Sequence, residues 1–171
     1  RPEELAVSEV KVANARVSLE DAKRAILNAL SDSYTKSDDA IRNKVDQCMN
    51  NPRGQNPKLA INADPQLTID IESERRNLEI TLTDWQATLF RLSSTSPSLD
   101  ALNTTENNLA LVLAFLDDVS LAVNALTSSS NLSQTTISGY KADMLTARTN
   151  VNTALSTLAS AKEKLRSAES T

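Results

Sequence analysis

Two stretches of the chain, one near each end, alternate a large apolar residue with a small one every seven residues. In residues 144–168 a methionine, valine or leucine stands at each seventh place, and an alanine follows it three places later. Residues 5–29 repeat this pattern, with a serine as the first small residue. The repeating positions are Leu5, Val12, Ala15, Leu19, Ala22, Ile26 and Ala29, and Met144, Ala147, Val151, Ala154, Leu158, Ala161, Leu165 and Ala168.

A seven-residue repeat of this kind predicts a helix with one buried edge. Two helices that carry alanine along that edge can approach closely, and large residues opposite the alanines fill the remaining space. The order of the two stretches in the chain favours an antiparallel pair. We therefore expect a long coiled-coil hairpin in which Leu5 lies near Ala168 and Ala29 lies near Met144. Its two ends would then lie side by side.

The composition supports an all-α fold. The chain of 171 residues has only 2 glycines, 5 prolines and 3% aromatic residues, against 40% hydrophobic residues. Such a chain is seldom interrupted, and its core must consist of leucine, valine, isoleucine and alanine, as in helices packed on helices. The length suits a single domain. Because the chain starts at Arg1 without a methionine, we expect it to be a segment of a larger protein.

Four helices are predicted. The first runs for about 45 residues from Pro2 and should end near Cys48, which we expect to be a buried, apolar-like residue. The others span about 66–93, 98–128 and 134–170, and the third is apolar on more than one face. The chain then divides into two arms, 3–29 and 144–170, that form the coiled coil, and an inserted helical portion, 30–143. Either the middle helices descend beside the coil, or the predicted register is wrong by a turn or more.

Several classes of chemistry find little support in the sequence. Without a histidine, the chain cannot form a histidine-based triad or a histidine zinc site. Its two glycines stand apart, so no glycine-rich phosphate loop is present. The net charge of −4 and the dispersed lysines and arginines give no basic face for nucleic acid. We expect no catalytic residue, no cofactor, no metal and no direct insertion into a membrane.

The longest irregular stretch, residues 50–66, is the only proline-rich one. Loops of more than about 12–15 residues inside a compact domain are often functional. With the loop "TSSSNLSQTT", it should lie at the end far from the termini. Two interpretations of this stretch remain open: it is a simple crossover loop, or it forms a surface that docks another protein. The candidate docking residues are Asn51, Arg53, Gln55 and Lys58.

The stretch "VANARVSLEDAKRAILNALSDSYTKSDDAIRNKVDQCMNNPRGQNP", with "ISGYKADMLTARTNVNTALSTLASAKEKLRSAES" near the end, resembles the helical region of bacterial HlyD-like adaptors. These are the membrane fusion proteins, or periplasmic adaptor subunits, of efflux and secretion pumps. In this family the chain leaves a split lipoyl-like domain along one helix and returns along another. The present sequence departs from the simple hairpin because two helices are inserted between the arms.

The resemblance implies a non-enzymatic helical domain that acts as a rigid spacer and as a protein-docking element. It implies an extracytoplasmic location in a parent protein anchored to a membrane. The partners it implies are an inner-membrane transporter, further copies of the adaptor and an outer component.

Two other functions fit a long helical bundle. An extracytoplasmic four-helix sensory domain of a chemoreceptor or sensor kinase would bind a ligand between helices near Trp85 and would dimerise through its first helix. A structural coiled-coil protein would have no transport role. The spacing of Tyr34 and Trp85 in the apolar stripes favours core positions for both.

Overall fold

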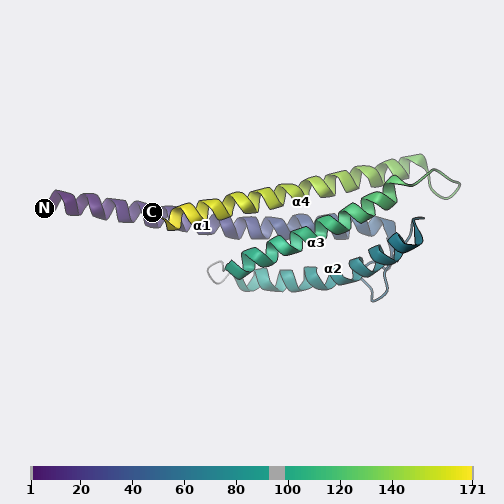
Figure 1. Ribbon diagram of the computed structural model, residues 1–171, viewed down its shortest axis with the longest axis horizontal. Coiled ribbons are helices and arrows are strands. Elements are labelled where there is room, and N and C mark those ends of the chain that lie inside the picture. The colour runs from purple at the N-terminus through teal and green to yellow at the C-terminus, as the bar shows by residue number, and fades with distance from the viewer. Residues whose placement is uncertain (1, 93–98, 171) are drawn as a thin grey trace.

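The computed structural model describes residues 2–92 and 99–170, and this part of the chain is all-α apart from one short hairpin (Figure 1). Four long helices form the molecule: α1 (Pro2–Asp38), α2 (Pro65–Leu92), α3 (Leu99–Asn124) and α4 (Gln134–Glu169). The all-α prediction is confirmed, and the four helices fall close to their predicted ranges. The predicted break at residues 93–98 lies outside the described residues.

Local sequence explains where two of the helices begin. Asp64 precedes Pro65, and its side chain accepts hydrogen bonds from the backbone N–H groups of Gln66 and Leu67, at 2.9 and 3.2 Å. Proline suits the first position of a helix because its missing N–H would have no partner there. At the start of α4, the Ser133 hydroxyl accepts from the Thr136 N–H at 3.0 Å. Both helices therefore start with a side-chain cap.

The first helix does not remain an α-helix throughout. After Asp38 it continues as a π-helix, η1 (Asp39–Lys44), and then as a tighter 3-10 turn, η2 (Val45–Cys48). The helical path thus ends where it was predicted to end. Cys48 is fully buried at this end, as predicted. π-Turns of this kind are rare, and they often mark functional or structurally constrained places.

Residues 50–66 are more ordered than a simple loop. Strand β1 (Met49–Asn50) pairs antiparallel with β2 (Lys58–Leu59), so a short hairpin follows η2. The sequence analysis did not predict these strands, because two residues are too few to show an alternating pattern.

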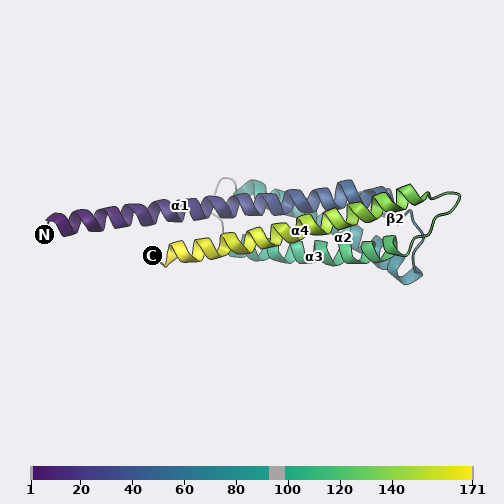
Figure 2. The same ribbon diagram turned by 90° about the horizontal axis from the view of Figure 1, so that it is seen from above.

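Helices α1 and α4 lie side by side and antiparallel along most of the molecule (Figures 1 and 2). Their register, however, differs from the prediction, which placed Leu5 near Ala168 and therefore Asp143 level with Leu30. Instead, the ammonium of Lys44, fourteen residues beyond Leu30, lies 3.2 Å from Asp143 Oδ1. Fourteen residues are two heptads, so the same helix faces still meet. The predicted register was wrong by this amount.

Contacts of η1 and η2 with α4 explain the register. They are the Lys44–Asp143 ion pair and a hydrogen bond from the Tyr140 hydroxyl to the Gln47 carbonyl at 3.3 Å. In this register Ile41 and Val45 also lie buried within the bundle. At the other end of the pair, Ala168 lines a surface hollow with Ser18 and Ala22. The first turns of α1 therefore extend beyond the end of α4 (Figure 2).

Helices α2 and α3 descend beside the α1–α4 pair, which is one of the two arrangements left open by the sequence. The ammonium of Lys162, near the end of α4, lies 2.7 Å from Glu106 Oε1 on α3. Buried side chains from all four helices form one core, and α3 contributes residues such as Leu109, Phe115 and Leu116. The four-helix part thus occupies the end of the molecule away from the termini (Figure 1).

Candidate docking surface at the distal end

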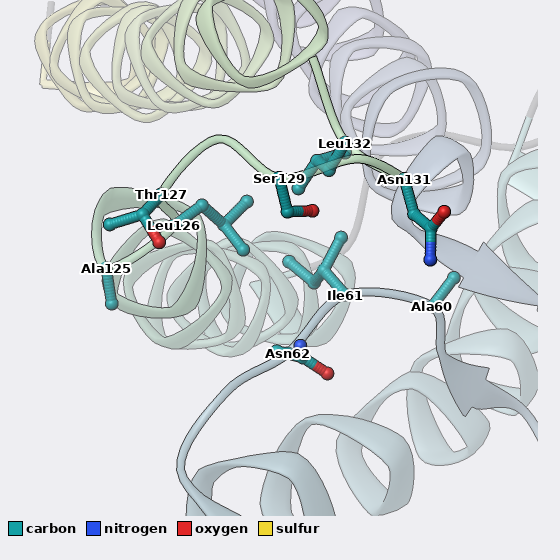
Figure 3. Close-up of a pocket in the computed structure, with 9 residues that line it drawn as sticks. All are labelled: Ala60, Ile61, Asn62, Ala125, Leu126, Thr127, Ser129, Asn131 and Leu132. Carbon is teal, nitrogen blue, oxygen red and sulfur yellow. The ribbon is translucent and has the colours of Figure 1, made fainter. Parts of the chain in front are cut away.

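The two loops far from the termini meet and enclose a hollow (Figure 3). One is the segment after β2 and the other joins α3 to α4. The hollow has a volume of about 390 Å³. Its lining consists of Ala60, Ile61, Asn62, Ala125, Leu126, Thr127, Ser129, Asn131 and Leu132. The prediction that both loops lie together at this end is confirmed.

The chemistry of this hollow is polar but uncharged. In Figure 3 the side chain of Ile61 lies between those of Ser129 and Asn62, and Leu126 lies to one side of it. None of the lining residues carries a charge. Such a surface offers hydrogen-bond donors and acceptors around a small apolar area, which is suited to binding.

The hairpin that forms one side of this end depends on a tight turn. Asn51 has a φ of 49°, in the left-handed region that asparagine tolerates better than most residues. The Gly54 N–H donates to the Asn51 carbonyl at 3.0 Å. A Cβ at position 54 would meet the end of the Asn51 side chain, which would have to move aside to make room for it.

All four candidate docking residues are exposed on the hairpin, but none lines the hollow. Arg53 Nε lies 3.6 Å from Asp46 Oδ2, and Lys58 Nζ lies 2.7 Å from Glu72 Oε2. The side chains of Arg53 and Lys58 nevertheless remain 59% and 55% exposed, so a partner can still reach them. Asn51 and Gln55 lie beside them on the same turn.

The base of the hairpin is fixed by α2. Glu72 accepts hydrogen bonds from Lys58 Nζ at 2.7 Å and from the Leu59 N–H at 3.0 Å. The hydrogen bond from Lys58 is the main reason why the pKa of Glu72 lies below its ordinary value. The Ala60 N–H donates to the Cys48 carbonyl at 2.7 Å. The hairpin is therefore held on both sides.

A buried ion cluster lies under this end and joins the first helix to α2. The Arg75 guanidinium donates to both carboxylate oxygens of Asp46, at 2.7 and 3.0 Å, and to Glu79 Oε2 at 3.0 Å. Arg42 donates to Glu79 Oε1 at 2.7 Å and to Asp38 Oδ1 at 2.8 Å. We call Asp38, Arg42, Asp46, Arg75 and Glu79 the Arg75 cluster.

The geometry of the cluster follows from helical spacing. Asp38, Arg42 and Asp46 stand four residues apart on the first helix, and Arg75 and Glu79 stand four apart on α2. Residues four apart share a helix face, so the two rows meet across the interface. The Arg75 side chain is completely buried, which an arginine tolerates only when its charge is paired.

The pKa shifts within the cluster reflect its pairing. Burial by itself raises the pKa of Glu79, but hydrogen bonds from Arg42 and Arg75 outweigh burial and bring it below its ordinary value. Burial likewise opposes the charge of Arg42, but Glu79 and Asp38 raise the pKa of its guanidinium. The pairing therefore favours the charged forms of both Glu79 and Arg42.

The sequence analysis missed both the Arg75 cluster and the lining of the hollow. A signal for Arg75 was present, because Ile71, Arg75, Leu78, Leu82 and Trp85 follow spacings of four and three along the buried stripe of α2. A charged residue in such a stripe predicts a buried ion pair. The lining residues gave no signal, since they belong to loops without a repeating pattern.

The predicted seam residues differ widely in burial. Ala15, Leu19, Leu165 and Ala168 are half-buried, and Leu5 and Val12 are exposed, at 62% and 49%. The exposed pair lies on the part of α1 that extends beyond α4. The buried members are Ala22, Ile26, Ala29, Met144, Ala147, Val151, Ala154, Leu158 and Ala161.

Trp85 lies in the packed interior, and the half-buried Tyr34 packs against the core. Their rings meet edge to face with centroids 5.7 Å apart, and Trp85 is only 2% exposed. Both therefore act as core residues, which was the favoured interpretation.

Within residues 2–92 and 99–170, no group of three or more cysteine, aspartate or glutamate side chains is placed to hold a metal ion. No helix in this part of the chain combines the length and the apolar character that a membrane span needs. No protein-family model matches the sequence, and no curated protein or solved structure matches it significantly.

Proposed function

We propose that this chain is a non-enzymatic helical domain of an HlyD-like transport adaptor. It acts as a rigid spacer in a bacterial efflux or secretion assembly, and its distal end docks a protein partner. The observation that carries the proposal is the antiparallel course of α1 and α4, which directs both termini away from the end that holds the loops (Figure 2). The sequence resemblance supports the choice of family, and this shape supports the spacer role.

The stiffness of the helices supports a spacer. From Pro2 to Cys48 the helical path covers about 70 Å at the rise of an α-helix. In the described helices, proline occurs only at the first position, at Pro2 and Pro65. The Arg75 cluster cross-links the first helix to α2 where the π-turn interrupts regular hydrogen bonding. A spacer of this kind transmits position without bending.

The distal end supports docking. The loops around the hollow offer uncharged polar groups, and the hairpin that precedes Ala60 adds the exposed side chains of Arg53 and Lys58. The partners we propose are the transporter, further copies of the adaptor and an outer component. A sensory domain would instead need ligand access near Trp85, and the burial of Trp85 favours the spacer.

Site-specific photocrosslinking in the intact parent protein, in its own cell envelope, tests the proposal. A photoreactive amino acid at Gln55 or Asn131, both exposed at the distal end, should form adducts with another component of the assembly. The same amino acid at Thr157, exposed on the side of α4, is the matched control and should not capture that component. Equal adducts from all three positions, or none from the distal pair, would contradict the proposal.

A further inference from the structure

A second surface feature lies on the side of the bundle, in a groove between α2 and α3. The groove has a volume of about 130 Å³. Its apolar surface comes from residues such as Leu78, Leu111 and Phe115, and Leu111 is 55% exposed at its edge. One carboxylate, that of Glu74, stands among these side chains. Asn77 and Thr81 are the other polar lining residues.

The environment of Glu74 is unfavourable for a charged group. Its Oε2 atom is buried and has no hydrogen-bond partner among the described residues. Burial, and then the nearby carboxylates of Asp118 and Asp70, raise the pKa of Glu74. Glu79, five residues further along α2, has two arginines as partners. Glu74 thus differs from Glu79 in that its buried oxygen has no hydrogen-bond donor among the described residues.

A half-buried acid with one buried, unpartnered oxygen destabilises a fold, so such a group often has a functional reason. We propose that this groove binds the side chain of a lysine or arginine presented by a protein partner. Its alkyl part lies on Leu111 and Phe115, and its cation pairs with Glu74.

The size and charge of the groove support this occupant. Pockets for drug-sized molecules measure about 300 Å³ or more, so a groove of this size accommodates one extended side chain. Long cationic side chains place their methylene groups on apolar surface and keep the charge at a polar tip. Asp70 and Asp118 add to the negative potential and favour a cation over a neutral group. This surface lies apart from the distal loops, so the proposal does not depend on the proposed function.

The proposal can be tested by titrating the whole chain with two model compounds and following its NMR resonances. Nα-acetylarginine methylamide represents the partner side chain, and the citrulline analogue has nearly the same shape without the charge. We expect the arginine compound to bind with a millimolar dissociation constant, to shift the resonances of Leu111 and Phe115, and to lower the pKa of Glu74. The citrulline compound should bind about tenfold more weakly, since a hydrogen bond to a charged group contributes about that factor.

Two variants complete the test. Glu74→Gln should remove the preference for arginine over citrulline, and the control Asp84→Asn, at an exposed carboxylate of α2, should leave it unchanged. Equal binding of the two compounds, an unchanged preference in E74Q, or no shift at Leu111 and Phe115 would overturn the proposal. Tighter binding of spermidine than of the arginine compound would identify a free polyamine as the occupant, and the assignment to a protein partner would be wrong.

Discussion

The ammonium of Lys44 lies 3.2 Å from Asp143 Oδ1, and this pair aligns the first helix with α4. The Tyr140 hydroxyl also donates to the Gln47 carbonyl. Together these two contacts hold the end of the first helical path against the early turns of α4. The seven-residue repeat alone allows several alignments that differ by whole heptads. The contacts at the distal end select one of them, and the start of α1 extends beyond α4 as a consequence.

Because of this register, buried and exposed residues of the predicted seam should contribute unequally to the free energy of unfolding. Ile26→Ala and Leu158→Ala remove fully buried side chains, and each should lower the free energy of unfolding by about 2–5 kcal/mol. Leu5→Ala and Val12→Ala change exposed side chains and should alter it by at most about 0.5 kcal/mol. Urea unfolding followed by circular dichroism measures both. A loss at Leu5 as large as that at Ile26 would show that the predicted register is populated.

Removal of Arg75 should be strongly destabilising. Arg75→Met leaves Asp46 buried without its main partner, which costs about 3–5 kcal/mol for a broken buried pair. Arg76→Met changes the exposed neighbour and serves as the control, with an effect of at most about 0.5 kcal/mol. The double variant Arg75→Met/Asp46→Leu should recover part of the loss. If R75M unfolds at the same urea concentration as R76M, the cluster does not hold the first helix to α2.

Glu74 should destabilise the fold at neutral pH, and its replacement should have the opposite effect. Its pKa is raised in the folded state, so the folded protein binds more protons than the unfolded one between the two pKa values. Stability therefore falls as pH rises through this interval. Glu74→Gln should therefore raise the melting temperature at pH 7. The gain in the free energy of unfolding should be about 1 kcal/mol or less, because the side chain is only half-buried.

The pH dependence of this gain separates charge from packing. Below the unfolded pKa of about 4.5, Glu74 is protonated in both the folded and the unfolded state of the protein without the substitution. The advantage of the E74Q variant should then disappear. Thermal melts at a series of pH values measure the difference. A gain that is the same at pH 3 and pH 7 would show that the charge of Glu74 is not the cause.

The thiol of Cys48 should be unreactive in the folded protein. Burial is the main reason that its pKa rises to about 12, and Asp143 adds to the effect. The thiolate is the nucleophile, so alkylation at pH 8 must wait until the end of the first helix opens. Mass spectrometry after iodoacetamide treatment should find labelling only when urea unfolds the chain. Rapid labelling without urea would mean that η2 opens readily.

The sequence predicted the class and number of helices well because apolar periodicity and capping residues act locally. Asp64 with Pro65, and Ser133 before α4, are local signals of this kind, and both act as caps in the structure. Such signals state where a helix starts and which face it buries. They carry no information on which heptad of one helix meets which heptad of another.

The register and the candidate site depend on contacts between distant segments. Lys44 and Asp143 are 99 residues apart in the chain, and Arg75 meets Asp46 across 29 residues. Each of these residues is ordinary in its own segment, apart from the position of Arg75 in an apolar stripe. The hollow at the distal end arises because two loops without a pattern meet there. Such arrangements follow from packing of the whole chain.

The measurement that tests the account most directly is a pair of distances between spin labels, in a chain with Cys48 replaced by alanine. One pair is placed on Ser18 and Ser167, which line the same surface hollow, and the other on Glu9 and Lys164. In the register set by Lys44 and Asp143, Glu9 lies about 21 Å along the axis from the position level with Lys164, at 1.5 Å per residue. The Ser18–Ser167 distance should therefore be the shorter of the two. If the Glu9–Lys164 distance is the shorter, the register set by Lys44 and Asp143 is wrong. If both distributions are broad, α1 and α4 do not form a rigid pair, and the spacer proposal fails.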